Sequence, residues 1–128
     1  MTSANRQQAA QAERRASAEA FRESKALAGL GHNGGAVSRA YYAAYHAARA
    51  LLFEKGIEPK THEGVRRMIG LHYVIPGLLS AAVADALAQL AYMREAADYA
   101  PAEPPETKQA EDALKLSREF LSAAGVES

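Results

Sequence analysis

The chain has 128 residues, of which 48% are hydrophobic and 23% are charged, and its 15 Lys/Arg balance its 15 Asp/Glu. This composition indicates one soluble globular domain and argues against a strongly basic nucleic-acid-binding protein. The absence of cysteine excludes a disulfide framework and thiol catalysis, and we expect a cytoplasmic protein without an export signal or a membrane span.

The first predicted helix covers residues 1–30, which are rich in Ala, Gln, Glu and Arg and contain no proline. Its N-terminal part offers little apolar surface. We therefore predict a polar extension over 1–14, a helical domain over 15–125 and a tail over 126–128. The glycines between residues 29 and 35 predict a break and a tight connection, which makes the first two helices antiparallel neighbours.

The central predicted helix, residues 34–56, has two different faces. The positions with the three- and four-residue spacing of a buried stripe are Val37, Tyr41, Ala44, Ala48, Leu51 and Leu52. The opposite face holds Arg39, Tyr42, His46, Arg49 and Phe53. Because that face is aromatic and basic, unlike a merely solvated helix surface, we predict that it has a second role.

The next segment predicts a short helix over residues 62–68, with Thr61 as its N-cap and a break near Gly70. Pro76 and Ser80 are both plausible start signals for the long helix that follows. The segment therefore connects two longer helices.

The long helix ends before Pro101, and the last predicted helix begins near Thr107 and ends at Gly125. The chain thus contains four long helices and one short helix, joined by brief loops. This pattern predicts an all-α protein, an antiparallel helical bundle.

The helix before Pro101 carries two charges on its apolar face. Its stripe of Val83, Leu87 and Leu90 is continued by Arg94 and Asp98. An ionised side chain in a low-dielectric interior costs several kcal/mol unless it is paired, so we predict that these two residues form an ion pair. The pair could lie in a functional cleft or could only fix helix packing.

Three stretches of the chain resemble the HEPN domain family, named for higher eukaryotes and prokaryotes nucleotide-binding. They are SRAYYAAYHAARALL at 38–52, PKTHEGV at 59–65 and REAADYA at 94–100. The resemblance covers about residues 15–125. It implies an all-α bundle, commonly dimeric and often encoded beside a minimal nucleotidyltransferase as a toxin–antitoxin pair. Many members of the family are metal-independent ribonucleases.

The chain departs from the ribonuclease members at one motif. Those members carry an Arg followed after about four to six residues by a His on a late helix, whereas Arg94 is followed here by Asp98 and Tyr99. A His in a similar relation to an Arg is His46 after Arg39, on the central helix. The resemblance therefore favours binding over cleavage, and an endoribonuclease activity stays open. The candidate catalytic residues are Arg94, Asp98, Tyr99 and His46, and the candidates for RNA or nucleotide binding or for a dimer cleft are Arg39, Tyr42 and Arg49.

Metal-independent RNA cleavage needs a base, an acid and cations that stabilise the phosphate. His46 with Arg39 and Arg49 could supply this set, and Tyr42 could stack on a base. A partly buried His at a dimer contact is the alternative for His46. His62, beside the short helix, shows no partner at a comparable spacing. We expect no cofactor and no metal, because the chain has neither repeated Glu-x-x-His units nor a phosphate-loop motif.

We therefore predict an RNA- or nucleotide-binding protein in a toxin–antitoxin-like pair with a minimal nucleotidyltransferase. The expected assembly is a homodimer with no membrane partner. The alternatives are an active metal-independent ribonuclease toxin and a purely structural dimerisation module.

Overall fold

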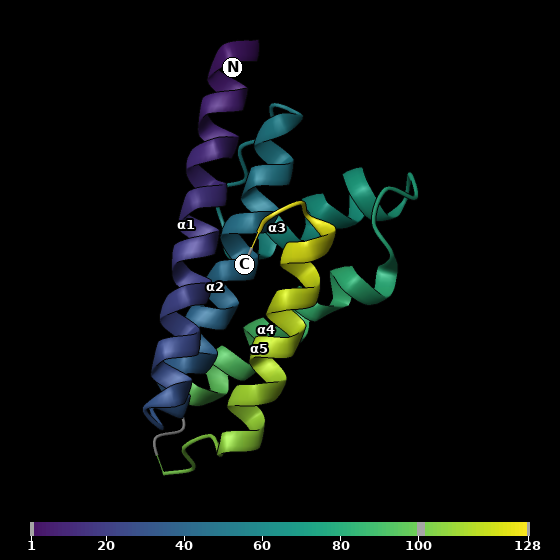
Figure 1. Ribbon diagram of the computed structural model, residues 1–128. Coiled ribbons are helices and arrows are strands. Elements are labelled where there is room, and N and C mark those ends of the chain that lie inside the picture. The colour runs from purple at the N-terminus through teal and green to yellow at the C-terminus, as the bar shows by residue number, and fades with distance from the viewer. Residues whose placement is uncertain (1, 100–101, 128) are drawn as a thin grey trace.

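The computed structural model describes residues 2–99 and 102–127, and all of its regular structure is helical. The elements are α1 (Ser3–Gly29), α2 (Asn33–Glu54), α3 (His62–Ile69), the π-helical segment η1 (Gly70–Val74), α4 (Ala81–Tyr99) and α5 (Thr107–Ala123). In Figure 1, α1 lies along α2, and α5 runs beside them. Because α2 contacts α1, α3, α4 and α5, it is the centre of the bundle. The predicted all-α bundle of four long helices and one short helix is confirmed.

The connection between α1 and α2 consists of residues 30–32 and is shorter than the one predicted from the glycines between residues 29 and 35. Helix α1 ends in a Schellman motif, in which the N–H of His32 donates to the carbonyl of Leu27 (2.9 Å) and Gly31 takes the left-handed φ of 78°. Gly34 and Gly35 lie in the first turn of α2, in agreement with the helix predicted over 34–56, so they do not form part of the connection. One glycine in the left-handed region is enough to end α1. The predicted division between the extension and the domain, at residue 14, falls inside α1, whose N-terminal end extends beyond the other helices (Figure 1).

The core is built on the predicted stripe of α2, all six members of which are buried. Alanines on the same helix, such as Ala40 and Ala47, leave room for α1 and α5 to approach closely, and large side chains such as Phe21 and Phe120 fill the space around them. Phe53, predicted on the open face, is also buried. Part of the reason is the guanidinium of Arg49, whose carbon lies 4.8 Å from the ring centroid.

Three buried serines tie the neighbouring helices to α2. The hydroxyls of Ser17 and Ser24 on α1 and of Ser117 on α5 donate to backbone carbonyls of α2. The acceptors are the carbonyl oxygens of Ala43 (2.7 Å), Ala36 (2.6 Å) and Ala40 (2.8 Å), respectively. These bonds satisfy hydroxyls that would otherwise be costly to bury.

The segment after α2 follows the prediction at its start and departs from it at its end. Thr61 caps α3 as predicted, since its hydroxyl accepts from the N–H of Gly64 (2.8 Å). The predicted break near Gly70 is wrong, because the helix widens there into η1 and continues to Val74. Tyr73 in η1 is buried, and its hydroxyl donates to the carbonyl of Leu51. This anchor in the core holds the chain in helical form past the glycine.

The last two helices begin where the capping signals predicted. Ser80 caps α4, and its hydroxyl accepts from the N–H of Val83 (3.1 Å). At the start of α5, the side chain of Gln109 accepts from the N–H of Glu106 (2.6 Å). Within residues 2–99 and 102–127, no helix combines the length and hydropathy needed to cross a membrane.

Candidate functional site

The predicted ion pair on α4 is present and faces the aromatic side of α2. Nη1 of Arg94 lies 3.1 Å from Oδ2 of Asp98. The guanidinium carbon of Arg94 is 5.1 Å from the ring centroid of Tyr41 and 5.7 Å from that of Tyr42. Both distances are within the range of a cation–π interaction. Arg94 therefore joins the two helices.

His62 at the start of α3 completes this cluster, although the helical spacing predicts no partner for it. Its Nδ1 lies 2.7 Å from the hydroxyl of Tyr41, and its ring stacks on that of Tyr45 at 4.4 Å between centroids. Burial lowers the pKa of His62, and the charges of Arg94 and Arg66 lower it further, so the imidazole is neutral at pH 7. Tyr41, predicted only as a core residue, thus also holds the imidazole in place.

A hollow of about 460 Å³ opens between α2, α3 and α4 beside this cluster. Its polar and aromatic lining consists of Tyr41, His62, Glu63, Arg66, Tyr92, Arg94, Glu95 and Tyr99. Tyr92 and Tyr99 are each 76% exposed, so they are available to a ligand. Arginines, an imidazole and free aromatic rings together are suited to an anion attached to a planar group.

His46 and Arg49 bind an acid from α1, and the ring of Tyr45, which contacts both of them, lies between them and His62. Nδ1 of His46 donates to Oε2 of Glu13 at 2.6 Å, and Nε of Arg49 donates to Oε1 at 3.1 Å. Burial by itself raises the pKa of Glu13, but these hydrogen bonds and the charges of Arg49 and His46 lower it by more, and the net direction is down. Neither His46 nor Arg49 lines the hollow beside Arg94.

Arg39 lies next to Tyr42 on α2. Its guanidinium carbon is 5.0 Å from the ring centroid of Tyr42, and its Nη1 is 3.5 Å from Oε1 of Glu23 on α1. Tyr42 thus contacts both Arg39 and Arg94. The predicted site residues are therefore divided. Arg94, Asp98, Tyr99 and Tyr42 gather at or beside the hollow, Arg39 adjoins them, and His46 and Arg49 are bound to α1.

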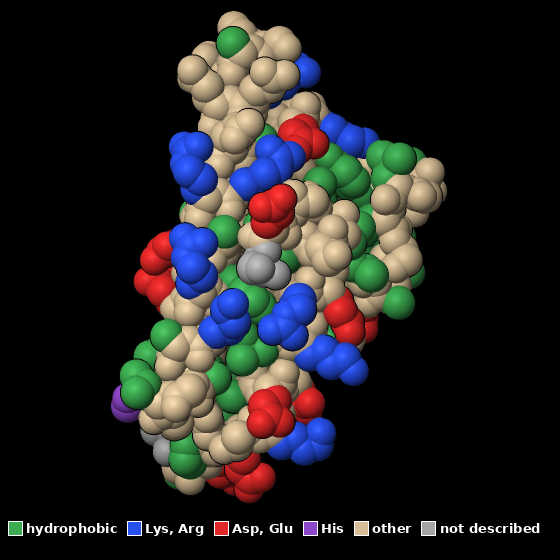
Figure 2. All heavy atoms as spheres, viewed as in Figure 1, with side chains coloured by type: hydrophobic (Ala, Val, Ile, Leu, Met, Phe, Trp, Pro, Cys, Tyr) green, Lys and Arg blue, Asp and Glu red, His purple; other side chains and the backbone are tan. Residues whose placement is uncertain are grey.

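The exposed face formed by α1 and α5 carries charges of both signs (Figure 2). Figure 2 shows Lys and Arg side chains spaced along α1 and between α1 and α5, with acidic side chains among them. Within residues 2–99 and 102–127, no three His, Asp or Glu side chains are grouped closely enough to hold a metal ion.

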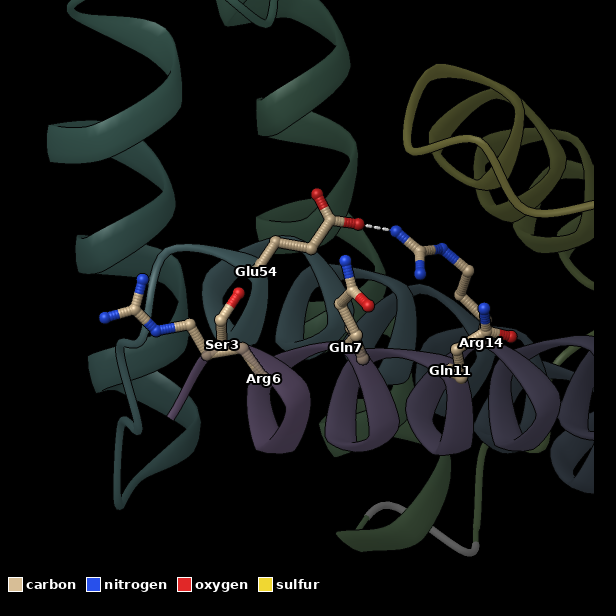
Figure 3. Close-up of a pocket in the computed structure, with 7 residues that line it drawn as sticks. Ser3, Arg6, Gln7, Gln11, Arg14 and Glu54 are labelled. Atoms are coloured by element: carbon tan, nitrogen blue, oxygen red, sulfur yellow. Dashed lines mark ion pairs between the residues drawn. The ribbon is translucent and has the colours of Figure 1, made fainter. Parts of the chain in front are cut away.

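A second hollow, of about 480 Å³, lies along the N-terminal half of α1 (Figure 3). One of its cations, Arg14, is paired with Glu54. The guanidinium of Arg6 points away from that pair and lies against Gly56. The rest of the lining is Ser3, Gln7, Ala10 and Gln11. With no aromatic ring or imidazole, this hollow is less suited to a nucleotide than the one beside Arg94.

Comparison with known proteins supports the resemblance that the motifs suggested. The chain is 37% identical over 86 residues to "Putative toxin MJ0605" of Methanocaldococcus jannaschii, which covers 67% of this chain and 63% of that protein. It is 31% identical over 87 residues to "Putative toxin MJ0142" of the same organism, a match that covers 68% of this chain and 59% of that protein. It is also 58% identical over 43 residues to "UPF0332 protein PH1297" of Pyrococcus horikoshii, a match that covers 34% of this chain and 30% of that protein. The matched part of the chain spans less than two thirds of the length of each of these relatives.

The match to a family as a whole is longer than the match to any of these relatives. The HEPN domain matches residues 10–127, which include all of α2, α3, α4 and α5. The chain therefore belongs to the HEPN domain family.

Proposed function

We propose that this HEPN protein is an RNA- or nucleotide-binding component of a toxin–antitoxin-like pair, with a minimal nucleotidyltransferase as its protein partner. The observation that carries the binding role is the guanidinium of Arg94, which lies within cation–π distance of Tyr41 and Tyr42 beside a hollow with two exposed tyrosines. Arginine planes and aromatic rings are what proteins use to hold single-stranded RNA. The toxin role is supported by the names of two relatives, each of which is called a putative toxin.

RNA binding can be measured by the fluorescence anisotropy of a labelled single-stranded oligonucleotide. We expect Arg94→Ala to weaken binding by about 1–3 kcal/mol, which is roughly five- to 150-fold. Arg22→Ala is the matched control, because Arg22 is an exposed arginine on α1 that pairs only locally, with Glu19. Lost stability with unchanged RNA binding in Arg94→Ala would instead support a structural dimerisation module.

The proposed partner and assembly can be tested separately. Expression of the protein alone is expected to arrest the growth of a bacterial host, and co-expression of a neighbouring nucleotidyltransferase gene is expected to relieve the arrest. The two proteins should then co-purify as a complex. Sedimentation of the isolated protein should give the mass of a homodimer. Growth without arrest, or a monomer at all concentrations, would contradict these parts of the proposal.

A second candidate function, metal-independent RNA cleavage, is favoured by one observation. A neutral imidazole, that of His62, lines the same hollow as Arg94. A neutral His can take the 2′-hydroxyl proton, and an arginine can stabilise the charge that builds on the phosphate. Labelled RNA incubated in EDTA should then be cleaved by the wild type and by His46→Ala but not by His62→Ala. Equal cleavage by all three proteins would show that neither His46 nor His62 takes part in the cleavage reaction.

A further inference from the structure

His62 lies in a positive electrostatic field. After burial, the influences that lower its pKa include the charges of Arg94, Arg66 and Arg49, all of which are positive. Such a field repels a proton from the ring and attracts an anion into the hollow that the ring lines.

The groups that face this ring come from all three surrounding helices. They are Tyr41, Tyr42, Tyr45, His46 and Arg49 on α2, Glu63 and Arg66 on α3, and Arg94, Glu95 and Asp98 on α4. Of the acids, Asp98 is bound to Arg94, and Glu63 and Glu95 are exposed to solvent. The positive charges of Arg66 and Arg94 therefore dominate the electrostatic potential at His62.

Tyr41 allows the imidazole to hold either one proton or two. Burial raises the pKa of Tyr41 to about 12, so its hydroxyl keeps its hydrogen at neutral pH. A hydroxyl can donate to Nδ1 of a neutral imidazole, and it can accept from the Nδ1–H of a protonated one. The contact at 2.7 Å therefore serves both states, and His62 can gain a proton without losing its hydrogen bond.

We propose that the hollow between α2, α3 and α4 is a phosphate-binding site, in which Arg66 and Arg94 hold the anion and His62 takes up a proton as it binds. The inference rests on the proposed RNA- or nucleotide-binding function and names the chemical group that is recognised. The volume of about 460 Å³ is within the range of sites for small ligands and is sufficient for a nucleotide. A base of the same ligand can stack on Tyr92 or Tyr99, which are exposed beside the arginines.

Proton uptake gives binding a defined dependence on pH. A bound anion offsets the positive field, so the pKa of His62 is higher in the complex than in the free protein. The affinity therefore rises as pH falls between these two pKa values, by at most about tenfold per pH unit, and is constant above the higher one. The probes should not titrate in this range, so sulfate and an RNA oligonucleotide are preferable to inorganic phosphate.

The first experiment follows the ring protons of His62 by NMR during a pH titration, with and without sulfate. The expected result is a higher pKa for His62 in sulfate and no comparable change for His72, which does not line the hollow. An unchanged pKa for His62 at saturating sulfate would overturn the proposal. Sodium chloride at equal ionic strength controls for general screening.

The second experiment measures RNA affinity between about pH 5 and 8 for wild type and three variants. Arg66→Gln is expected to weaken binding roughly tenfold or more, because it removes a charged donor from the hollow. Arg67→Gln, its neighbour on α3, is exposed and outside the hollow and should bind like wild type. His62→Gln should bind like wild type at high pH but should not bind more tightly as pH falls.

The outcomes separate this inference from the proposed function. RNA binding that is insensitive to Arg66→Gln and His62→Gln would leave the function standing and overturn the site. A sulfate-dependent shift of His62 without any RNA binding would support the anion site and contradict the RNA-binding function. Circular dichroism of each variant verifies that a loss of binding is not a loss of fold.

Discussion

Replacing Glu13 by Gln tests how strongly the acid on α1 stabilises the packing of α1 on α2. The Glu13 side chain is only 15% exposed and accepts from His46 at 2.6 Å and from Arg49 at 3.1 Å. Fully exposed ion pairs contribute at most about 1 kcal/mol, and hydrogen bonds to charged groups about 1.5–3 kcal/mol. Since His46 and Arg49 are about a quarter exposed, we expect Glu13→Gln to lower the free energy of unfolding by about 2 kcal/mol at pH 7. For a chain of this size that is a decrease in Tm of about 7 °C.

The sign of the pH dependence follows from the direction of the Glu13 pKa. Burial raises that pKa, but the hydrogen bond from His46 and the charge of Arg49 together lower it by more than burial raises it. The folded value is therefore below the ordinary value of 4.5. A lowered acid pKa stabilises the folded state above 4.5, and this stabilisation is lost as pH falls through the folded pKa. The difference in stability between wild type and Glu13→Gln should therefore be present at pH 7 and should vanish in acid.

Urea unfolding followed by circular dichroism measures this difference at each pH. Glu19→Gln is the matched control, because Glu19 lies on the same helix but its ion pair with Arg22 is about 60% exposed. Its effect should stay within about 0.5 kcal/mol. The reasoning would be refuted if Glu13→Gln unfolded like wild type at pH 7, or if its deficit persisted below the folded pKa.

Two further predictions concern the backbone and the buried hydroxyls. Gly31→Ala and Gly56→Ala should each lower the free energy of unfolding by about 1 kcal/mol because of their φ of 78° and 73°. The Cβ added at Gly56 would also lie 2.8 Å from Nε of Arg6, but this guanidinium ends a flexible side chain and can move aside, so a much larger loss for Gly56→Ala in urea unfolding would contradict the prediction. Ser117→Ala should cost about 1 kcal/mol, because it removes one hydrogen bond but leaves the carbonyl of Ala40 paired within α2. A loss of several kcal/mol would indicate that the helices repack.

Local signals were sufficient to predict most of the fold. The buried stripe of α2 repeats every three or four residues, and Thr61 and Ser80 are capping residues next to the helices they start. The pairing of Arg94 with Asp98 could also be predicted, because four residues span one helical turn. The continuation of the helix past Gly70 could not, since it depends on an anchor in the tertiary core.

The candidate site was predicted only in part, because its key contacts join distant positions. Tyr41 and His62 are 21 residues apart, and Glu13 and His46 are 33 apart. No helical spacing relates such pairs, so His62 was given no partner and His46 was given a role beside Arg94. One signal for His62 was present, since it lies in one of the three stretches that carry the family resemblance.

The serine hydroxyls described above also determine which parts of the protein can respond to a ligand. A slide of α1 or α5 along α2 by about half a turn, roughly 2.7 Å, would separate Ser17, Ser24 or Ser117 from its acceptor and leave a buried hydroxyl without a hydrogen bond. These three helices therefore resist small slides along one another. Any rearrangement around a bound anion is left to α3, η1 and α4, which carry Arg66 and Arg94, while the tyrosines of α2 stay where they are.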